Sequence, residues 1–182
     1  CQSLREIKEI KEVSLSLMRF SVILPIYNEV DFIEETLSSI ISGNNLTNAE
    51  ILIIDGMSDD GTREIVTSYI EQNKGINIRL FDNNQKTVAY AMNIGIKNSS
   101  GEFIVRMDAH SIFPSGYIDR LLHWMVILNA DNVGGVVETI PSGASSCAVA
   151  ISTSVSSSYG IGNSLFRTIM DGDPLEVDTV PF

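Results

Sequence analysis

Hydrophobic residues along this chain fall into short continuous runs that alternate with longer stretches in which they recur every three or four positions. A short continuous run is typical of a β-strand buried on both faces, and the wider spacing is typical of an amphipathic helix. The pattern predicts strands over 21–26, 50–55, 77–81, 103–107 and 132–139. It predicts helices over 31–42, 62–72, 87–97, 115–128 and, with a weaker pattern, 145–155.

Strands and helices that alternate one for one form right-handed βαβ units. We therefore expect an α/β fold with a mainly parallel sheet and helices on both of its faces. Ligands bind such sheets outside the carboxyl ends of the strands. Polar residues that directly follow a strand are thus the candidates for function.

Length and charge limit the classes of function. The 182 residues suffice for one domain with a sizeable core. With 12 basic and 23 acidic residues the formal net charge is −11, which argues against a nucleic-acid partner. An anionic ligand would need a metal ion or backbone N–H groups to hold it. The two cysteines, Cys1 and Cys147, form no disulfide framework, and this predicts a reducing, cytoplasmic compartment.

The two ends of the chain differ from the rest. Charged residues interrupt the segment 1–17, so it is not a signal peptide, and we expect an extension of cloning or natural origin. The domain is expected to span 18–182 and to be cut within an apolar run, "VDTVPF". No run approaches the roughly 20 apolar residues of a membrane span.

The stretch "FIVRMDAHS" ends an apolar run on Asp108 and His110. In an extended segment, residues two apart point the same way, so the carboxylate and the imidazole would face one point. Such a pair suits Mn²⁺ or Mg²⁺, with phosphate oxygens completing the shell. The alternative is an aspartate that caps the next helix beside a solvated histidine, and the triplet taken alone favours it.

The stretch "LPIYNEVDF" places Tyr27, Asn28 and Glu29 after the first strand. An aromatic ring among polar groups can stack on a nucleobase. Ordinary turn and helix-start chemistry explains the same residues equally well.

The stretch "ILIIDGMSDDGT" runs from a strand into Asp55 and a loop with Gly56 and Gly61. A strand–turn–helix connection capped by Ser58, Asp59 or Asp60 is a strong structural explanation for it. No Gly-x-Gly-x-x-Gly follows a strand and no Gly-Lys-Ser/Thr occurs, so neither a dinucleotide fingerprint nor a P-loop is supported.

In their order, "SVILPIYNE", "ILIIDGMSDDGT" and "AMNIGIKNSSGEFIVRMDAH" resemble the inverting family 2 glycosyltransferases across Phe20–Pro114. That family has the type-A nucleotide-diphospho-sugar transferase fold. The later "ADNVGG", "YGIGNSLFR" and "VDTVPF" are similar to its succinoglycan-biosynthesis glucosyltransferase subgroup. On this resemblance, 18–182 is the nucleotide-sugar-binding part of a glycosyltransferase domain.

The resemblance implies a role for each matching residue. Those that would bind the nucleotide sugar are Pro25, Tyr27, Glu29, Asp55, Lys86 and Asp108. Tyr27 would flank the base, Asp55 would approach the uracil, and Lys86 would be a basic nucleotide contact. Asp108 and His110 would stand at the two acidic positions of a D-x-D motif and hold Mn²⁺ or Mg²⁺.

Two positions depart from the family pattern. Gly56 stands where members often carry a second aspartate, and His110 replaces the second acid of D-x-D. The base that deprotonates the acceptor is expected beyond Phe182, and we assign none. The carboxylates nearest that region match no family motif: Asp171, Asp173, Glu176 and Asp178.

The predicted function is metal-dependent, inverting transfer of a hexose, glucose by the subgroup, from a UDP-sugar to a lipid-linked or oligosaccharide acceptor in bacterial exopolysaccharide synthesis. The full-length protein would be cytoplasmic, with peripheral association at the inner face of the plasma membrane as an option. One alternative is a non-catalytic nucleotide-sugar-binding fragment. A nucleotidyltransferase is disfavoured, because "PIYNEVDF" lacks glycine, lysine and arginine.

Overall fold

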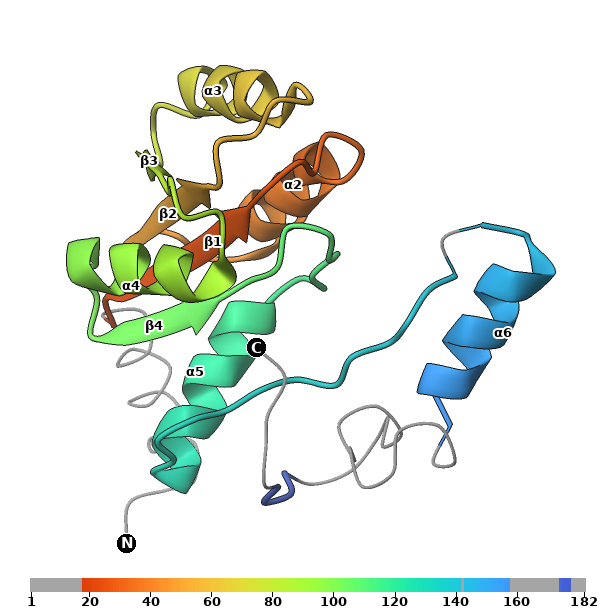
Figure 1. Cartoon of the computed structure of the whole chain (residues 1–182). Helices are drawn as coiled ribbons and strands as arrows, with labels where there is room; N and C mark the ends of the chain where they lie inside the picture. Colours follow the sequence, from red (N-terminus) through yellow and green to blue (C-terminus); the bar gives the residue numbers. More distant parts are fainter. Residues whose placement is uncertain (1–17, 142, 158–173, 178–182) are drawn as a thin grey trace, which may run out of the picture. The chain divides into compact units, whose positions relative to one another are not determined.

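The computed structural model describes residues 18–141, 143–157 and 174–177 of the chain. The chain divides into two compact units, the first ending at Leu122 and the second beginning at His123. Strands and helices alternate through the first unit (Figure 1), in the order β1 (Phe20–Ile26), α2 (Ile33–Gly43), β2 (Ala49–Asp55), α3 (Thr62–Gln72), β3 (Asn77–Asp82), α4 (Val88–Asn98), β4 (Phe103–Arg106) and α5 (Tyr117–Leu128). Helix α5 runs across the division between the units.

The four strands form one parallel sheet in the order β3-β2-β1-β4. This confirms the predicted α/β class. The chain moves from β1 to β2 and β3 in one direction, and then crosses to the other side of β1 to add β4. The strand order therefore reverses between β1 and β4. In open parallel sheets this reversal, the switch point, is where ligands bind.

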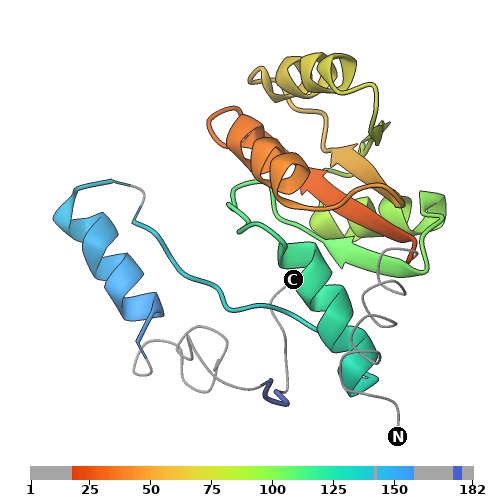
Figure 2. The ribbon, with the colours of Figure 1, turned by 180° about the vertical axis from the view of Figure 1, so that it is seen from behind.

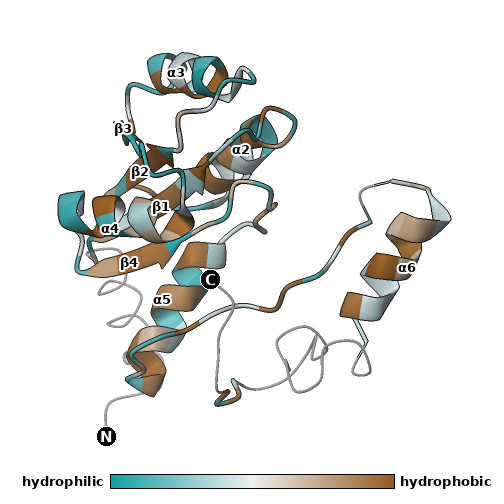
Figure 3. Cartoon of the chain, in the orientation of Figure 1, coloured by the Kyte–Doolittle hydropathy of each residue, from teal (hydrophilic) through white to brown (hydrophobic). Residues whose placement is uncertain are grey.

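Both faces of the sheet are covered. Val22 and Leu24 of β1 pack in a cluster with residues of α2, α3 and α5, whereas Ile23 packs with Ala91 of α4. Helix α4 lies in front of the sheet in Figure 1, and α2 lies in front in the reverse view of Figure 2. Burial on both faces explains why β1 and β2 are largely apolar runs, visible as mostly brown ribbon in Figure 3.

A buried polar network ties the amino ends of the strands together. Glu50 of β2 is 4% exposed, and its carboxylate accepts hydrogen bonds from Ser21 Oγ (2.7 Å), Ser100 N (2.6 Å), Ser100 Oγ (2.9 Å) and Arg79 Nη2 (2.6 Å). Burial alone would raise the pKa of Glu50, but the bonds from Ser21, Ser100 and Arg79 outweigh it and lower the pKa to about 2. Glu50 therefore links β1, β3 and the segment before β4 as a carboxylate.

The second unit contains helix α6 (Ser146–Val155), close to its predicted range. Ser145 Oγ accepts a 3.2 Å bond from Ala148 N at the start of this helix, and Ser152 Oγ donates to Thr139 O at 2.7 Å.

The predicted strand 132–139 is wrong, because the structure shows no strand in this segment. A strand needs a ladder partner, which a hydrophobic pattern cannot supply, and Gly134 and Gly135 weaken the strand preference. Within the described part of the chain, no helix is long and apolar enough to cross a membrane. Residues 1–17, "YGIGNS" and 178–182 lie outside the described residues.

Candidate functional site

Residues predicted from two separate motifs meet at the switch point. Glu29 follows β1, and His110 follows β4. Atom Nδ1 of His110 lies 3.2 Å from Oε1 of Glu29. The structure thus joins the two sides of the switch point through side chains that the sequence analysis proposed independently.

Burial alternates along the segment after β4. Met107 and Ala109 are buried, whereas Asp108 is half-buried and His110 is exposed. Thr36 of α2 fixes the segment by donating a 2.8 Å bond to Ala109 O. This alternation agrees with the expectation that Asp108 and His110 point to the same side of the segment.

The predicted metal ligands, Asp108 and His110, have atom types that suit a divalent cation. A carboxylate oxygen and an imidazole nitrogen are both ligands that Mn²⁺ accepts. Asp108 Oδ1 meanwhile accepts bonds from Arg106 Nε (3.3 Å) and Nη2 (3.2 Å). Among the residues that the structure describes, no three His, Cys, Asp or Glu side chains come together as a metal site. The protein alone would therefore fill few coordination positions, and a diphosphate would have to supply others.

Tyr27, which follows β1, and Lys86, which precedes α4, come together. The ammonium Nζ of Lys86 lies 4.9 Å from the centre of the Tyr27 ring and 3.4 Å from its hydroxyl oxygen. Lys86 has a positive φ of 57° and donates its backbone N–H to Asn83 O at 3.1 Å. The Tyr27 side chain remains 42% exposed. An exposed ring next to a cation can receive a nucleobase and its phosphates.

Pro25 lies near the end of β1, at a place where it breaks no ladder bond. Ile23 O accepts a 3.0 Å bond from Met107 N, so position 25, two residues on, faces the same side. Pairing between β1 and β4 ends at Ile23 and Arg106. The missing N–H of Pro25 therefore points past the end of β4.

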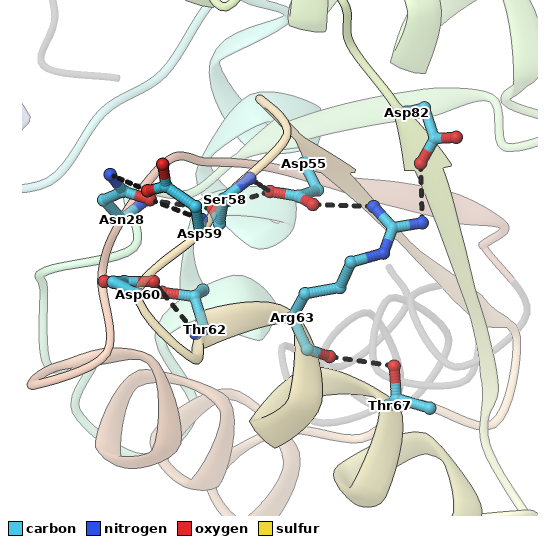
Figure 4. A network of polar contacts seen from close by, with 9 residues as sticks. All are labelled: Asn28, Asp55, Ser58, Asp59, Asp60, Thr62, Arg63, Thr67 and Asp82. Carbon is cyan, nitrogen blue, oxygen red and sulfur yellow. Dashed lines mark hydrogen bonds and ion pairs between the residues drawn. The ribbon is translucent and has the colours of Figure 1, made fainter.

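Asp55 is fully buried at the end of β2, with both oxygens bound within the chain (Figure 4). Its Oδ1 accepts from Ser58 N at 3.0 Å and from Ser58 Oγ at 2.6 Å. Its Oδ2 accepts from Arg63 Nη1 at 2.7 Å. In the structure Asp55 organises the loop after β2, and the contact with uracil that the resemblance implies stays a prediction.

Arg63 is a residue that the sequence analysis missed. Its Nη2 lies 2.6 Å from Asp82 Oδ1, so one guanidinium joins the ends of β2 and β3. The hydrogen bonds to Asp55 and Asp82 raise the pKa of Arg63. A signal was available, because Arg63 occupies the first turn of α3, where the helix dipole disfavours a cation. A cation at that position indicates an acidic partner.

The loop after β1 and the loop after β2 are cross-bonded, and we call residues 27–30 and 55–62 the paired loops. Asn28 and Asp59 exchange two 3.0 Å bonds, from Asn28 Nδ2 to Asp59 Oδ1 and from Asp59 N to Asn28 Oδ1. Asn28 also has a positive φ of 55°, which supports the turn interpretation for this residue.

The start of α3 completes the paired loops. Glu29 N donates to Thr62 Oγ1 at 2.8 Å, and Val30 N donates to Asp60 Oδ2 at 3.1 Å. Burial would raise the pKa of Asp60, but hydrogen bonds from Thr62 and Val30 hold it below its ordinary value. Asp60 Oδ1 accepts a 3.0 Å bond from Thr62 N at the start of α3, although the N-cap residue is Gly61 and not Ser58, Asp59 or Asp60 as predicted. The backbone of Glu29 is fixed by these contacts.

Of the four carboxylates considered near the carboxyl terminus, the structure describes one. Glu176 is exposed, and the other three lie outside the described residues. No catalytic base is assigned.

A protein-family comparison decides the family. The model described as glycosyl transferase family 2 matches residues 21–173. The chain belongs to this family. Two curated proteins are similar to the chain. The succinoglycan biosynthesis protein ExoA of Rhizobium meliloti is 28% identical over 149 residues, which are 81% of this chain and 44% of that protein. Glycosyltransferase AglE of Haloferax volcanii is 33% identical over 125 residues, which are 68% of this chain and 41% of AglE.

Solved structures show the same fold. The mannosyltransferase PcManGT from Pyrobaculum calidifontis, in complex with GDP-Man and Mn²⁺, superposes with a TM-score of 0.60 at 27% identity, over 67% of this chain and 36% of PcManGT. S. aureus TarS 1-349, in complex with UDP, gives 0.59 at 24% identity, over 70% and 38%. The chain spans less than half the length of each of these four proteins.

Proposed function

We propose that this chain is the donor-binding part of an inverting, metal-dependent glycosyltransferase. It would take a UDP-sugar, with glucose as the hexose, and serve transfer to a lipid-linked or oligosaccharide acceptor in polysaccharide synthesis. The observation that carries the proposal is the meeting of Glu29 and His110 across the switch point, 3.2 Å apart.

Similar proteins support the class of reaction. ExoA is named for succinoglycan biosynthesis, and PcManGT was solved with a nucleotide sugar and Mn²⁺. The choice of UDP and of glucose rests on the motif resemblance. The full-length protein is proposed to be cytoplasmic, with peripheral association at the inner face of the plasma membrane.

Different residues would bind different parts of the nucleotide sugar. Tyr27 would stack on the base, and Lys86, beside the ring, would balance negative charge on the phosphates. Asp108 and His110 would hold the divalent cation, with Glu29 orienting the imidazole of His110 through its Nδ1. The cation supplies charge neutralisation for the diphosphate as it leaves.

The charge of the protein supports the proposed need for a cation. A chain with a formal net charge of −11 repels a diphosphate at long range. Lys86 alone among the proposed donor-binding residues is cationic. We therefore expect diphosphate affinity to depend on the metal.

Titration calorimetry with UDP tests the proposal. Binding should be strong with Mn²⁺ or Mg²⁺ and should fall at least tenfold when EDTA replaces the metal. Equal affinity in both conditions would remove the metal role. A chain that binds no UDP or UDP-glucose with metal present would overturn the proposed function.

A second candidate is a non-catalytic nucleotide-sugar-binding chain. It is favoured by the absence of an assigned base among the described residues, since a base contributes about 10²–10⁴-fold to transfer. Release of UDP from UDP-glucose, with a lipid-linked galactose acceptor, separates the two. Turnover by this chain would show that the base lies within the 182 residues.

A further inference from the structure

Gly56 lies directly against the ring of Tyr27. A Cβ atom added at Gly56 would come within 3.0 Å of Tyr27 Cδ2, 3.1 Å of Cβ and 3.2 Å of Cγ. These distances are shorter than ordinary van der Waals contact between carbon atoms. In this chain, a Cβ at position 56, such as that of the aspartate that family members often carry there, would therefore need the Tyr27 side chain to shift.

The backbone at position 56 does not itself require glycine. Gly56 does not have a positive φ. Among the described residues, the glycines with a positive φ are Gly61 and Gly116. The N–H of Gly56 donates a 2.8 Å bond to Ile26 O, which anchors it to the end of β1. The constraint at Gly56 is therefore the ring of Tyr27 and not the main chain.

A second contact fixes the far end of the same ring. Lys86 Nζ lies 3.4 Å from the Tyr27 hydroxyl, while the space at Gly56 is taken by atoms at the near end of the side chain. The ring is therefore located at both ends before any ligand arrives. A ring that is already in place loses less conformational entropy when a flat group stacks on it.

We propose that Gly56 is a positioning residue for the donor nucleotide. By having no side chain, it lets Tyr27 lie where its exposed surface meets Lys86. A methyl group at position 56 would displace the ring by a few tenths of an ångström and change its position relative to Lys86. This inference rests on the proposed function, because it names the residue that sets the position of the stacking platform.

Calorimetry on glycine variants tests it. Gly56→Ala should weaken UDP binding in the presence of Mn²⁺ by three- to tenfold, with an unchanged melting temperature. Gly75→Ala is the matched control, because a Cβ there meets no atom within 4 Å. It should alter UDP affinity less than twofold.

A double variant separates positioning from a general disturbance. In a Tyr27→Ala background, Gly56→Ala should have no further effect on UDP affinity, because its influence passes through the ring. A loss that persists in this background, or a Gly56→Ala variant that matches Gly75→Ala, would overturn the inference while leaving the proposed function intact.

A measurement without nucleotide keeps the two proposals distinct. The ε-methylene protons of Lys86 near the Tyr27 ring should be shifted upfield by the ring current in spectra of lysine-labelled protein. Tyr27→Leu should abolish the shift, and Gly56→Ala should reduce it. If the wild-type chain binds no UDP, the proposed function fails, and the chemical shifts still test whether Gly56 positions the ring of Tyr27. An unchanged Lys86 shift in Gly56→Ala would refute that positioning role.

Discussion

Arg63 Nη1 donates a 2.7 Å hydrogen bond to Oδ2 of the fully buried Asp55. The same guanidinium reaches Asp82 with its other terminal nitrogen at 2.6 Å. Two strand ends on the ligand side of the sheet are thus held by one side chain. Removing that side chain would leave a buried carboxylate with only its bonds from Ser58.

Arg63→Met is therefore expected to destabilise the fold by roughly 3 kcal/mol, the low end for breaking a buried pair, because Arg63 is itself partly exposed. Urea unfolding measures the change. The matched control is Arg19→Met, which removes a 3.6 Å pair with Glu102 whose side chains are 64% and 62% exposed. That pair should be worth less than about 1 kcal/mol. Equal losses in the two variants would contradict the assigned role of Arg63.

Glu50 should make stability depend on acid pH. Its pKa in the folded chain is lowered from 4.5 to about 2. A lowered pKa stabilises the fold fully above the unfolded value, and the contribution is lost as the pH falls from about 4.5 to about 2. The full contribution is on the order of 3 kcal/mol, since one pKa unit corresponds to about 1.4 kcal/mol. Unfolding of wild type and Glu50→Gln between pH 7 and pH 2.5 checks this. The difference between them should be constant at high pH and shrink below about pH 4.5; a difference independent of pH would count against the assignment.

Tyr27→Ala should weaken UDP binding by roughly 1–3 kcal/mol, as base–aromatic stacks do on alanine substitution. The melting temperature should change little, because the ring is substantially exposed. Tyr27→Phe keeps the ring and should retain most of the affinity, although it loses the hydroxyl near Lys86. A large fall in melting temperature with unchanged affinity would instead assign Tyr27 to packing.

His110→Asp should increase the dependence of UDP binding on Mg²⁺. A neutral imidazole adds no negative charge to the site, and Mg²⁺ prefers oxygen donors. The new carboxylate would lie near Glu29, so the two acids would repel until a cation binds between them. Calorimetry with Mg²⁺ and with EDTA should show a larger ratio of affinities than in wild type. Asp119→Asn, an exposed acid on α5, is the control and should leave the ratio unchanged.

The sheet and its helices were predictable because each element carries its own periodic signal. Residues 62–72 and α3 coincide, and the other regular elements of the first unit differ by one or two residues. The segment 132–139 failed for the opposite reason: its apolar residues meet the local criterion for a strand, but pairing is a long-range property. No pattern within those eight positions specifies a partner.

The candidate site was predictable in position more than in contacts. The rule that ligands bind at carboxyl strand ends placed Tyr27, Glu29, Asp55 and His110 at one edge. It did not show that Asp55 is buried, with its oxygens bound by Ser58 and Arg63, whereas Tyr27 and His110 are exposed. Whether Asp55 is free to bind a ligand depends on the side chain of Arg63, eight positions later. The unfavourable place of Arg63 in the first turn of α3 is an indirect sign of an acidic partner, but the sequence spacing does not identify Asp55 as that partner.

The reciprocal bonds between Asn28 and Asp59 have a consequence for engineering. Each loop supplies donors and acceptors that the other satisfies, so neither is a self-contained module. If residues 27–30 were replaced by those of a relative that uses another nucleotide sugar, Asp59, Asp60 and Thr62 would lose their matching hydrogen-bond partners. A variant designed to change the nucleotide sugar must therefore replace residues 55–62 together with residues 27–30.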